Sequence, residues 1–393
     1  MKKIISLFSL FLLSHFFKAQ ITPILAYQTR VNQVSAANIN NGLQEFVNLG
    51  VKTTGSTANN NAFSWLKTKY TSFGYTTSQM SEDTFTYSGN PSKNLIVTKT
   101  GTLYPNTYVI ICGHYDSIVG VGANDNGSGT TAILEIARIL KDIPTEYSIK
   151  FIHFSGEEQG LLGSQHYVSN VVNSTNPKMD IHLVFNLDQI GGRNGQTNNT
   201  VYCERDTNNN PSTNNATSTS RTQELMDYVE AYSTLTPILS SAYASDYMPF
   251  QSNNEIITGF YEHNGSSNPF EHTANDVISN MDPAYLVSVT KAALGALQHF
   301  AVASTQNLAL NEVKKSNFLF EIVPNPAKDF IEIKFENQNN KKFTFELLDA
   351  SGRLVKSVEN ESKINISNFE NGMYTGTLIL DHVKNSKKIL IQK

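Results

Sequence analysis

The chain has 393 residues, of which 39% are hydrophobic and 16% charged, and its formal net charge at pH 7 is −4. This length allows about two or three domains, and this apolar content is typical of a globular protein with a packed core. The slightly acidic balance argues against a nucleic-acid partner. The two cysteines, Cys112 and Cys203, exclude a disulfide framework, and we interpret them as small core residues. A metal ion would therefore be held by nitrogen and oxygen.

The first residues have the pattern of a targeting segment. Lys2 and Lys3 precede an apolar run over residues 4–17, which ends near the small residue Ala19. A basic start, a short apolar run and a small residue at a cleavage point are typical of a signal peptide, here residues 1–19. No later stretch reaches the ~18 apolar residues that a membrane span needs. The sequence therefore predicts an exported protein.

Residues 20–303 show helical and strand-like patterns in alternation. Helices are expected over 34–48, 57–72, 128–141, after Leu161, over 221–233 and from the Asp282-Pro283 cap to about 303; strands are expected over 76–87, 94–98, 108–112, 148–154 and 181–187. Segments 207–220 and 241–272 are expected to be irregular. This alternation predicts an α/β fold with a mixed, mostly parallel sheet sandwiched by helices.

The pattern changes after residue 303. Residues 304–318 are polar and mixed, and we interpret them as a linker. Residues 319–393 contain short alternating runs separated by turn signals, at 330–335, 343–348, 376–380 and 389–391. This part is expected to form a small all-β sandwich domain.

The most informative stretch is residues 108–129. An apolar β-branched run ends in His114 and Asp116, and a glycine-punctuated loop then carries Asp125 to the start of an amphipathic helix. Open α/β sheets bind their ligands at the carboxyl ends of strands. Imidazole nitrogens and carboxylate oxygens are ligands that zinc accepts.

Further candidates follow later strands. Glu157 and Glu158 come after the strand at 148–154, Asp188 ends the next strand, and His272 lies in the aromatic segment. Glu158, Asp188 and His272, together with His114 and Asp125, are five candidate ligands that could hold two zinc ions if one carboxylate bridges them. Glu157 would then accept a proton from the attacking water. Asp116 is expected to accept a hydrogen bond from the second ring nitrogen of His114.

Each motif alone has a plainer interpretation. The Asp125 loop alone is more typical of a surface turn with a helix cap, and paired glutamates are more typical of a charged first helical turn. A single histidine is more often a hydrogen-bonded structural residue, and Asp188 alone would be a turn residue. The conjunction of all of them, each at the end of an element, favours a metal centre.

Five segments carry a family resemblance: 113–117, 124–129, 156–164, 186–188 and 272–276. Across residues 35–303 the chain resembles the secreted di-zinc aminopeptidases of the bacterial leucyl aminopeptidase type. The resemblance implies a zinc-exopeptidase fold, of the phosphorylase/hydrolase-like kind. It also implies secretion and the hydrolysis of N-terminal residues from peptides or proteins.

The resemblance also implies site roles. One zinc is held by His114 and Asp188, and the other by Glu158 and His272. Asp125 bridges the two ions, and its peptide bond to Asn126 is expected to be cis. Glu157 is the general base that acts on a metal-bridged water. The expected substrate-binding residues are Tyr243, Asp246, Tyr247, Phe250 and Tyr261. Tyr247 occupies a position at which these enzymes usually have histidine. Tyr243 lies one residue away from the position of the corresponding tyrosine in these enzymes.

The tail carries a second resemblance, at residues 323–327, 349–353, 371–374 and 387–391. These motifs resemble C-terminal sorting domains of type IX secretion. The resemblance implies contact with that secretion machinery, passage across the outer membrane to the surface or medium, and removal of the tail. A carbohydrate- or surface-binding sandwich is an alternative.

Three other functions remain open. A glutaminyl-cyclase-like transferase shares the fold with a single zinc, and a non-catalytic ectodomain of the transferrin-receptor kind lacks ligands. A zinc carboxypeptidase would have the same metal core, but segment 241–272 contains no arginine to bind a substrate carboxylate. Arg193, Arg205 or Arg221 could approach from elsewhere. We expect an aminopeptidase that is a monomer.

Overall fold

The computed structural model describes residues 21–263, 268–306, 320–335, 341–350, 353–380 and 383–393. The chain divides into two compact units, one up to Asn307 and one from Leu308. The expected signal peptide and most of the expected linker lie outside the described residues, so the exact domain boundaries stay predictions. Among the described helices, none combines the length and apolar character needed to cross a membrane.

The first unit is built on an eight-stranded sheet. In spatial order its strands are β1 (Met80–Tyr87), β2 (Asn90–Lys99), β4 (Tyr147–Phe154), β3 (Tyr104–His114), β5 (Asp180–Leu187), β8 (Ile257–His263), β6 (Thr200–Arg205) and β7 (Thr236–Ser241). The pairs β3–β4, β3–β5, β5–β8 and β6–β7 are parallel, and the other three are antiparallel. The predicted mixed, mostly parallel sheet is confirmed.

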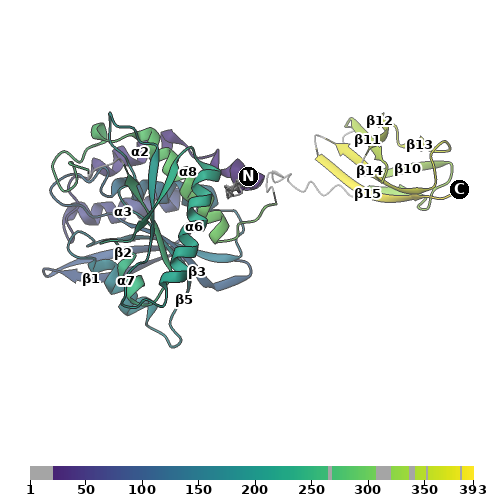
Figure 1. Ribbon diagram of the computed structural model, residues 1–393. Coiled ribbons are helices and arrows are strands. Elements are labelled where there is room, and N and C mark those ends of the chain that lie inside the picture. The colour runs from purple at the N-terminus through teal and green to yellow at the C-terminus, as the bar shows by residue number, and fades with distance from the viewer. Residues whose placement is uncertain (1–20, 264–267, 307–319, 336–340, 351–352, 381–382) are drawn as a thin grey trace, which may run out of the picture. The chain divides into compact units, whose positions relative to one another are not determined.

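Helices cover both faces of this sheet (Figure 1). The larger apolar cluster packs one face against α1 (Leu25–Val31), α2 (Ala36–Val47), α3 (Thr57–Ser72), α4 (Gly127–Leu140), α6 (Asn215–Tyr232) and α8 (Pro283–Phe300). A smaller cluster packs the other face against α5 (Leu162–Tyr167), a π-helix (Val168–Val172) and α7 (Met248–Ser252). Both cysteines are buried and free, one in each cluster, as expected for core residues.

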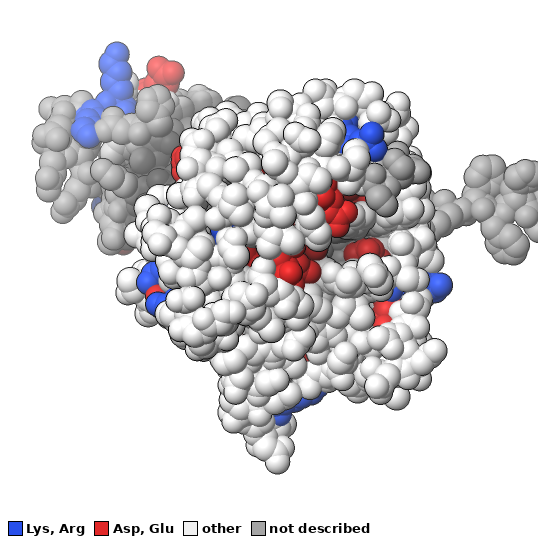
Figure 2. Space-filling view, turned by 90° about the vertical axis from the view of Figure 1, so that its left-hand side faces the viewer, with Lys and Arg blue, Asp and Glu red and all other residues white. Residues whose placement is uncertain are grey.

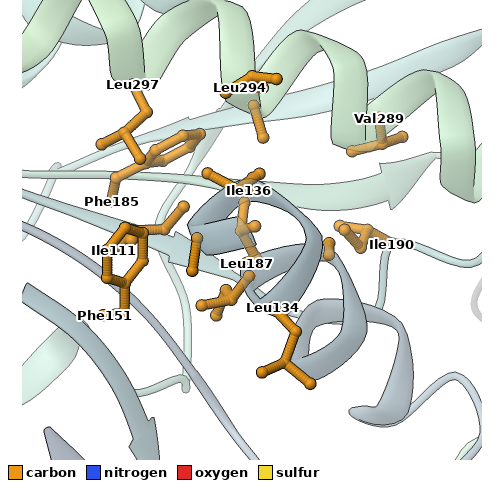
Figure 3. Packing of buried hydrophobic residues seen from close by; sticks show 14 of the residues in the cluster. Ile111, Leu134, Ile136, Phe151, Phe185, Leu187, Ile190, Val289, Leu294 and Leu297 are labelled. Atoms are coloured by element: carbon orange, nitrogen blue, oxygen red, sulfur yellow. The ribbon is translucent and has the colours of Figure 1, made fainter. Parts of the chain in front are cut away.

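Helix α4 fixes the loop that precedes it. Its apolar residues at helical spacing are buried, and Figure 3 shows Ile136 among side chains of the sheet and of α8, including Phe185 and Leu294. The helix is capped by Asn126, whose Oδ1 accepts the N–H of Gly129 at 2.8 Å. Because a cap fixes where a helix begins, the packed helix holds the residue before the cap, Asp125, at the edge of the sheet.

Two expectations for the first unit are wrong. Residues 215–220, expected as loop, form the start of α6, and the expected irregular segment 241–272 contains α7 and the interior strand β8. Intrinsic propensity is weak over 215–220, and tertiary contacts decide the helix. There Ser218 Oγ accepts the N–H of Asp206 at 2.8 Å and donates to the carbonyl of Ile257 at 2.6 Å. Strands β6 and β7 were also not expected.

The second unit is all β, as predicted. A three-stranded sheet, β13-β10-β9, and a four-stranded sheet, β12-β11-β14-β15, share one apolar cluster. The strands are β9 (Phe320–Val323), β10 (Phe330–Phe335), β11 (Phe343–Leu348), β12 (Leu354–Glu359), β13 (Lys363–Asn365), β14 (Gly372–Leu380) and β15 (Val383–Ile391). Burial alternates along β10, with Ile331 and Ile333 facing the core, as a two-sheet sandwich requires.

Candidate metal centre

The predicted ligands come from neighbouring strands of the sheet. His114 is the last residue of β3, Glu157 and Glu158 lie in the turn after β4, and Asp188 directly follows β5. These strands are parallel neighbours, so their carboxyl ends meet at one edge. His272 reaches the same place from the segment after β8, which is parallel to β5.

Asp125 lies between the two histidines. Its Oδ1 is 3.2 Å from Nε2 of His114, and its Oδ2 is 3.1 Å from Nε2 of His272. The two oxygens of one carboxylate therefore face different imidazoles, which is the arrangement that a bridging ligand needs. The Asp125–Asn126 peptide bond is cis, as expected.

Each histidine has a further carboxylate beside it. Asp188 Oδ1 lies 3.3 Å from Nε2 of His114, and Glu158 Oε2 lies 3.0 Å from Nε2 of His272. Glu157 is set back, with its Oε2 at 4.0 Å from the same nitrogen of His114. The structure thus brings all five expected ligands together and places Glu157 beside them.

One acidic residue beside the centre, Glu271, was not predicted from the sequence. Candidate ligand atoms of Asp125, Glu271 and His272 lie within 4.8 Å of one another, as do those of His114, Asp125 and Asp188. Glu271 is also 4.0 Å from Nε2 of His272. Its position next to His272 in the sequence is the only signal that could have indicated it.

Asp116 acts differently from the expectation. Its carboxylate is 3.6 Å from Nδ1 of His114, beyond hydrogen-bond distance, whereas its backbone carbonyl oxygen is closer, at 3.3 Å. The carboxylate instead accepts the backbone N–H groups of Glu157 and Glu158, each at 3.3 Å, and the hydroxyl of Thr54. Asp116 therefore fixes the turn that carries the two glutamates.

Two further residues position ligands. Asp276 accepts the backbone N–H groups of Asn124 at 2.8 Å and Asp125 at 3.0 Å, so it holds the loop before α4. Ser245 Oγ donates to Oδ2 of Asp188 at 2.6 Å. Both pairs join segments far apart in the chain, and hydrogen-bonded ligands keep a fixed orientation for a metal.

The donor set fits a pair of cations. Oδ2 of Asp125 is buried and accepts no hydrogen bond from the described residues. Burial would raise the pKa of Asp125, but the imidazoles of His114 and His272 beside its carboxylate lower it to about 2. Burial raises the pKa of Glu157 to about 10, with the charge of Asp188 acting in the same direction and that of His114 opposing. So many buried carboxylates require positive charge, and two divalent ions would supply it.

A cavity of about 520 Å³ opens beside this centre. Its lining includes three of the expected substrate-binding residues, Tyr243, Tyr247 and Tyr261. The other two were wrongly expected there. Phe250 packs into the core with the rings of Phe154 and Tyr167, and Asp246 is fully buried outside the lining.

The distribution of charge agrees with an acidic cleft. Figure 2 shows a face of the molecule where Asp and Glu side chains gather in a hollow, while Lys and Arg side chains lie toward its edges. Five acidic residues line the cavity: Asp125, Glu157, Asp188, Glu204 and Glu271.

Curated relatives match part of the chain. The chain is 41% identical to Aminopeptidase YwaD of Bacillus subtilis over 107 residues, which are 27% of this chain and 23% of that protein. It is 33% identical to Leupeptin-inactivating enzyme 1 of Streptomyces exfoliatus over 176 residues, 44% of this chain and 37% of that protein. The matches thus span well under half of these relatives' lengths.

Solved structures share the fold. LapB of Legionella pneumophila matches with a TM-score of 0.62 and 20% identity, over 72% of this chain and 77% of that chain. A glutaminyl cyclase of Bacteroides thetaiotaomicron matches with a TM-score of 0.54 and 17% identity, over 67% and 97%. The fold is therefore shared with LapB and with a glutaminyl cyclase.

Family profiles match both units. Residues 321–392 match the secretion system C-terminal sorting domain, which agrees with the resemblance of the tail and indicates export. Residues 94–297, more than half of the chain, match peptidase family M28. This stretch contains His114, Asp125, Glu158, Asp188 and His272, and the chain belongs to peptidase family M28.

Proposed function

We propose that this protein is a secreted di-zinc aminopeptidase that removes N-terminal residues from peptides or proteins. The observation that carries the proposal is the position of Asp125, whose two carboxylate oxygens face His114 and His272 at 3.2 and 3.1 Å. In this arrangement His114 and Asp188 would hold one zinc ion, and Glu158 and His272 the other. Glu271 is close enough to contribute to the second ion.

The reaction needs a proton acceptor beside the ions. Two zinc ions, when bound, would polarise the scissile carbonyl and lower the pKa of a water molecule. Glu157 would accept the proton of the attacking water and pass it to the leaving amine. The carboxylate of Asp116 accepts the backbone N–H of Glu157. The carboxylate of Glu157 is 4.0 Å from Nε2 of His114, farther than those of Asp125 and Asp188, which are 3.2 and 3.3 Å from the same nitrogen.

The cavity favours an aminopeptidase over a carboxypeptidase. Among the described residues that line it there is no lysine or arginine, so the lining offers no ammonium or guanidinium group to bind a substrate's terminal carboxylate. Arg193, Arg205 and Arg221, which could have approached from elsewhere, do not line it. A free N-terminal ammonium group, in contrast, would meet an acidic surface.

The single-zinc cyclase alternative is less well supported. Two histidines with a shared carboxylate and two further carboxylates provide donors for two ions, and all five side chains converge. The non-catalytic alternative is disfavoured for the same reason, because no ligand position is lost.

The test compares one peptide in three forms. The zinc-loaded enzyme should release the first residue from the free and the C-amidated peptide but not from the N-acetylated one. A carboxypeptidase would cleave the N-acetylated form and reject the C-amidated one. A cyclase would release ammonia from a peptide with N-terminal glutamine without shortening it. Metal analysis should find two zinc ions per chain.

The tail and the N-terminus support a route of export. Residues 1–19 would act as the signal peptide, and the C-terminal domain would then engage the type IX machinery and be removed. Mass spectrometry of the protein in the culture medium tests this route, since the mature chain should lack both segments. Gel filtration of the mature enzyme tests the expectation of a monomer.

A further inference from the structure

The cavity extends beyond the metal centre along β6 and β7. Tyr202 and Glu204 of β6 line it together, because residues two apart in a strand face the same side. Ser240 and Ser241 at the end of β7 line the same part. Glu204 belongs to neither group of candidate metal-ligand atoms, so the proposed chemistry leaves this carboxylate without a role.

Glu204 is buried but only half paired. Its side chain is 7% exposed, and its Oε2 accepts the hydroxyl of Tyr247 at 2.6 Å. None of the described residues donates a hydrogen bond to its Oε1. Burial raises the pKa of Glu204 to about 8, although the hydrogen bond from Tyr247 lowers it. A cation in the cavity would favour the ionised form of this carboxylate.

Tyr247 holds Glu204 in a fixed place. The Tyr247 hydroxyl also accepts the backbone N–H of Tyr243 at 2.9 Å. The Tyr247 ring lies against Gly259 of β8, where an added Cβ would come within 2.8 Å of Cε1 of the ring. Glycine at 259 is therefore needed for the tyrosine to reach Glu204.

The described lining of the cavity offers Glu204 no permanently charged partner. None of the described residues that line it is a lysine or an arginine. Buried carboxylates in proteins are normally paired with a positive group, because an unpaired buried charge is costly. The missing positive group would be supplied by whatever occupies the cavity.

We propose that Glu204 is a specificity residue that binds the basic side chain of the substrate's N-terminal residue, so that the enzyme prefers lysine or arginine there. This inference rests on the proposed aminopeptidase function. Tyr202 and Tyr261, which also line the cavity, offer aromatic surface to the aliphatic stem and the cation.

The α-ammonium group of the substrate is a less suitable partner for Glu204. That group is only two bonds from the carbonyl carbon that is attacked, so it must lie beside the metal ions. Glu271 is placed there, with ligand atoms of Asp125 and His272 within 4.8 Å. Glu204 lies on β6 and belongs to neither group of candidate ligand atoms.

The test uses 7-amido-4-methylcoumarin derivatives of lysine, arginine and norleucine with the zinc-loaded enzyme. Norleucine has the chain length of lysine without its amine. The wild type should show a kcat/KM for lysine about 10- to 100-fold above that for norleucine, the range expected for a hydrogen bond to a charged group. In Glu204→Gln this ratio should fall to near one. Glu230→Gln, an exposed glutamate of α6, is the matched control and should keep the wild-type ratio.

Binding gives a second readout that does not need turnover. By calorimetry, free lysine should bind the zinc-loaded wild type at least tenfold more tightly than norleucine, and Glu204→Gln should lose this difference. Equal kcat/KM for lysine and norleucine in the wild type would overturn the inference while leaving the proposed function intact. An equal loss on both substrates in Glu204→Gln would assign Glu204 to the α-ammonium group instead, which also overturns it. If no substrate is hydrolysed, the proposed function fails, and the lysine-binding difference alone decides whether the pocket is basic-specific.

Discussion

Replacing Glu157 by glutamine should abolish most turnover without removing metal. The substitution keeps the size of the side chain and its backbone hydrogen bond to Asp116, and removes only the ability to accept a proton. Glu157 Oε2 is 4.0 Å from Nε2 of His114, whereas Asp125 and Asp188 lie at 3.2 and 3.3 Å. The ligands that hold the metal are therefore untouched.

The expected size of the effect follows from the role. A general base typically contributes ~10²–10⁴-fold to the rate. This range corresponds to about 3–5 kcal/mol of activation free energy at ~1.4 kcal/mol per tenfold. Because the side chain does not hold a metal, the loss should appear in kcat, with two zinc ions still bound and with an unchanged melting temperature.

The neighbouring residue provides the control. Glu158→Gln makes the same chemical change one position along the chain, in a side chain whose Oε2 is 3.0 Å from Nε2 of His272. It should lose about one zinc ion per chain together with activity. The assay measures kcat on an aminoacyl coumarin and the zinc content of the same dialysed samples. If Glu157→Gln lost zinc in proportion to activity, Glu157 would be a ligand and the assignment of roles would be wrong. If it kept more than a tenth of wild-type kcat, another group would be the base.

Three further predictions concern the support of the centre and the domain organisation. Asp276→Asn should weaken zinc binding about 10- to 100-fold and destabilise the protein by ~1.5–3 kcal/mol. The reason is that each oxygen of the Asp276 carboxylate accepts one N–H group, of Asn124 or of Asp125, and asparagine replaces one of these oxygens by an NH2 group that can only donate. Zinc titration and urea unfolding measure the two effects. Removing zinc with a chelator should abolish activity and lower the melting temperature, because the buried carboxylates lose their counter-ions, and zinc should restore both; a melting temperature independent of zinc would contradict the fit of the donor set. Deleting residues 319–393 should leave kcat unchanged and prevent export, and an inactive shortened protein would place the domain boundary elsewhere.

Part of the fold could be predicted because its signals are local. The amphipathic pattern at residues 128–141 and the apolar runs at 108–112 and 181–187 each lie within one element, and the structure contains α4, β3 and β5 there. Strand β8 could not be predicted, because residues 257–263 form a strand by pairing with β5 on one side and β6 on the other. Pairing partners that are distant in the chain leave little trace in a short sequence window.

The sequence by itself determined which side chains are available for metal binding. His114 and Asp188 are recognisable because each ends or follows a buried strand, and the carboxyl ends of neighbouring parallel strands must meet. Only the tertiary structure decided how these side chains are used. It turns the two oxygens of Asp125 toward different histidines, joins Asp276 to that loop, and places Glu204 in the wall of the cavity. These relations depend on how distant segments pack, because hydrogen bonds and burial are set by contacts across the fold and not by neighbours in the chain.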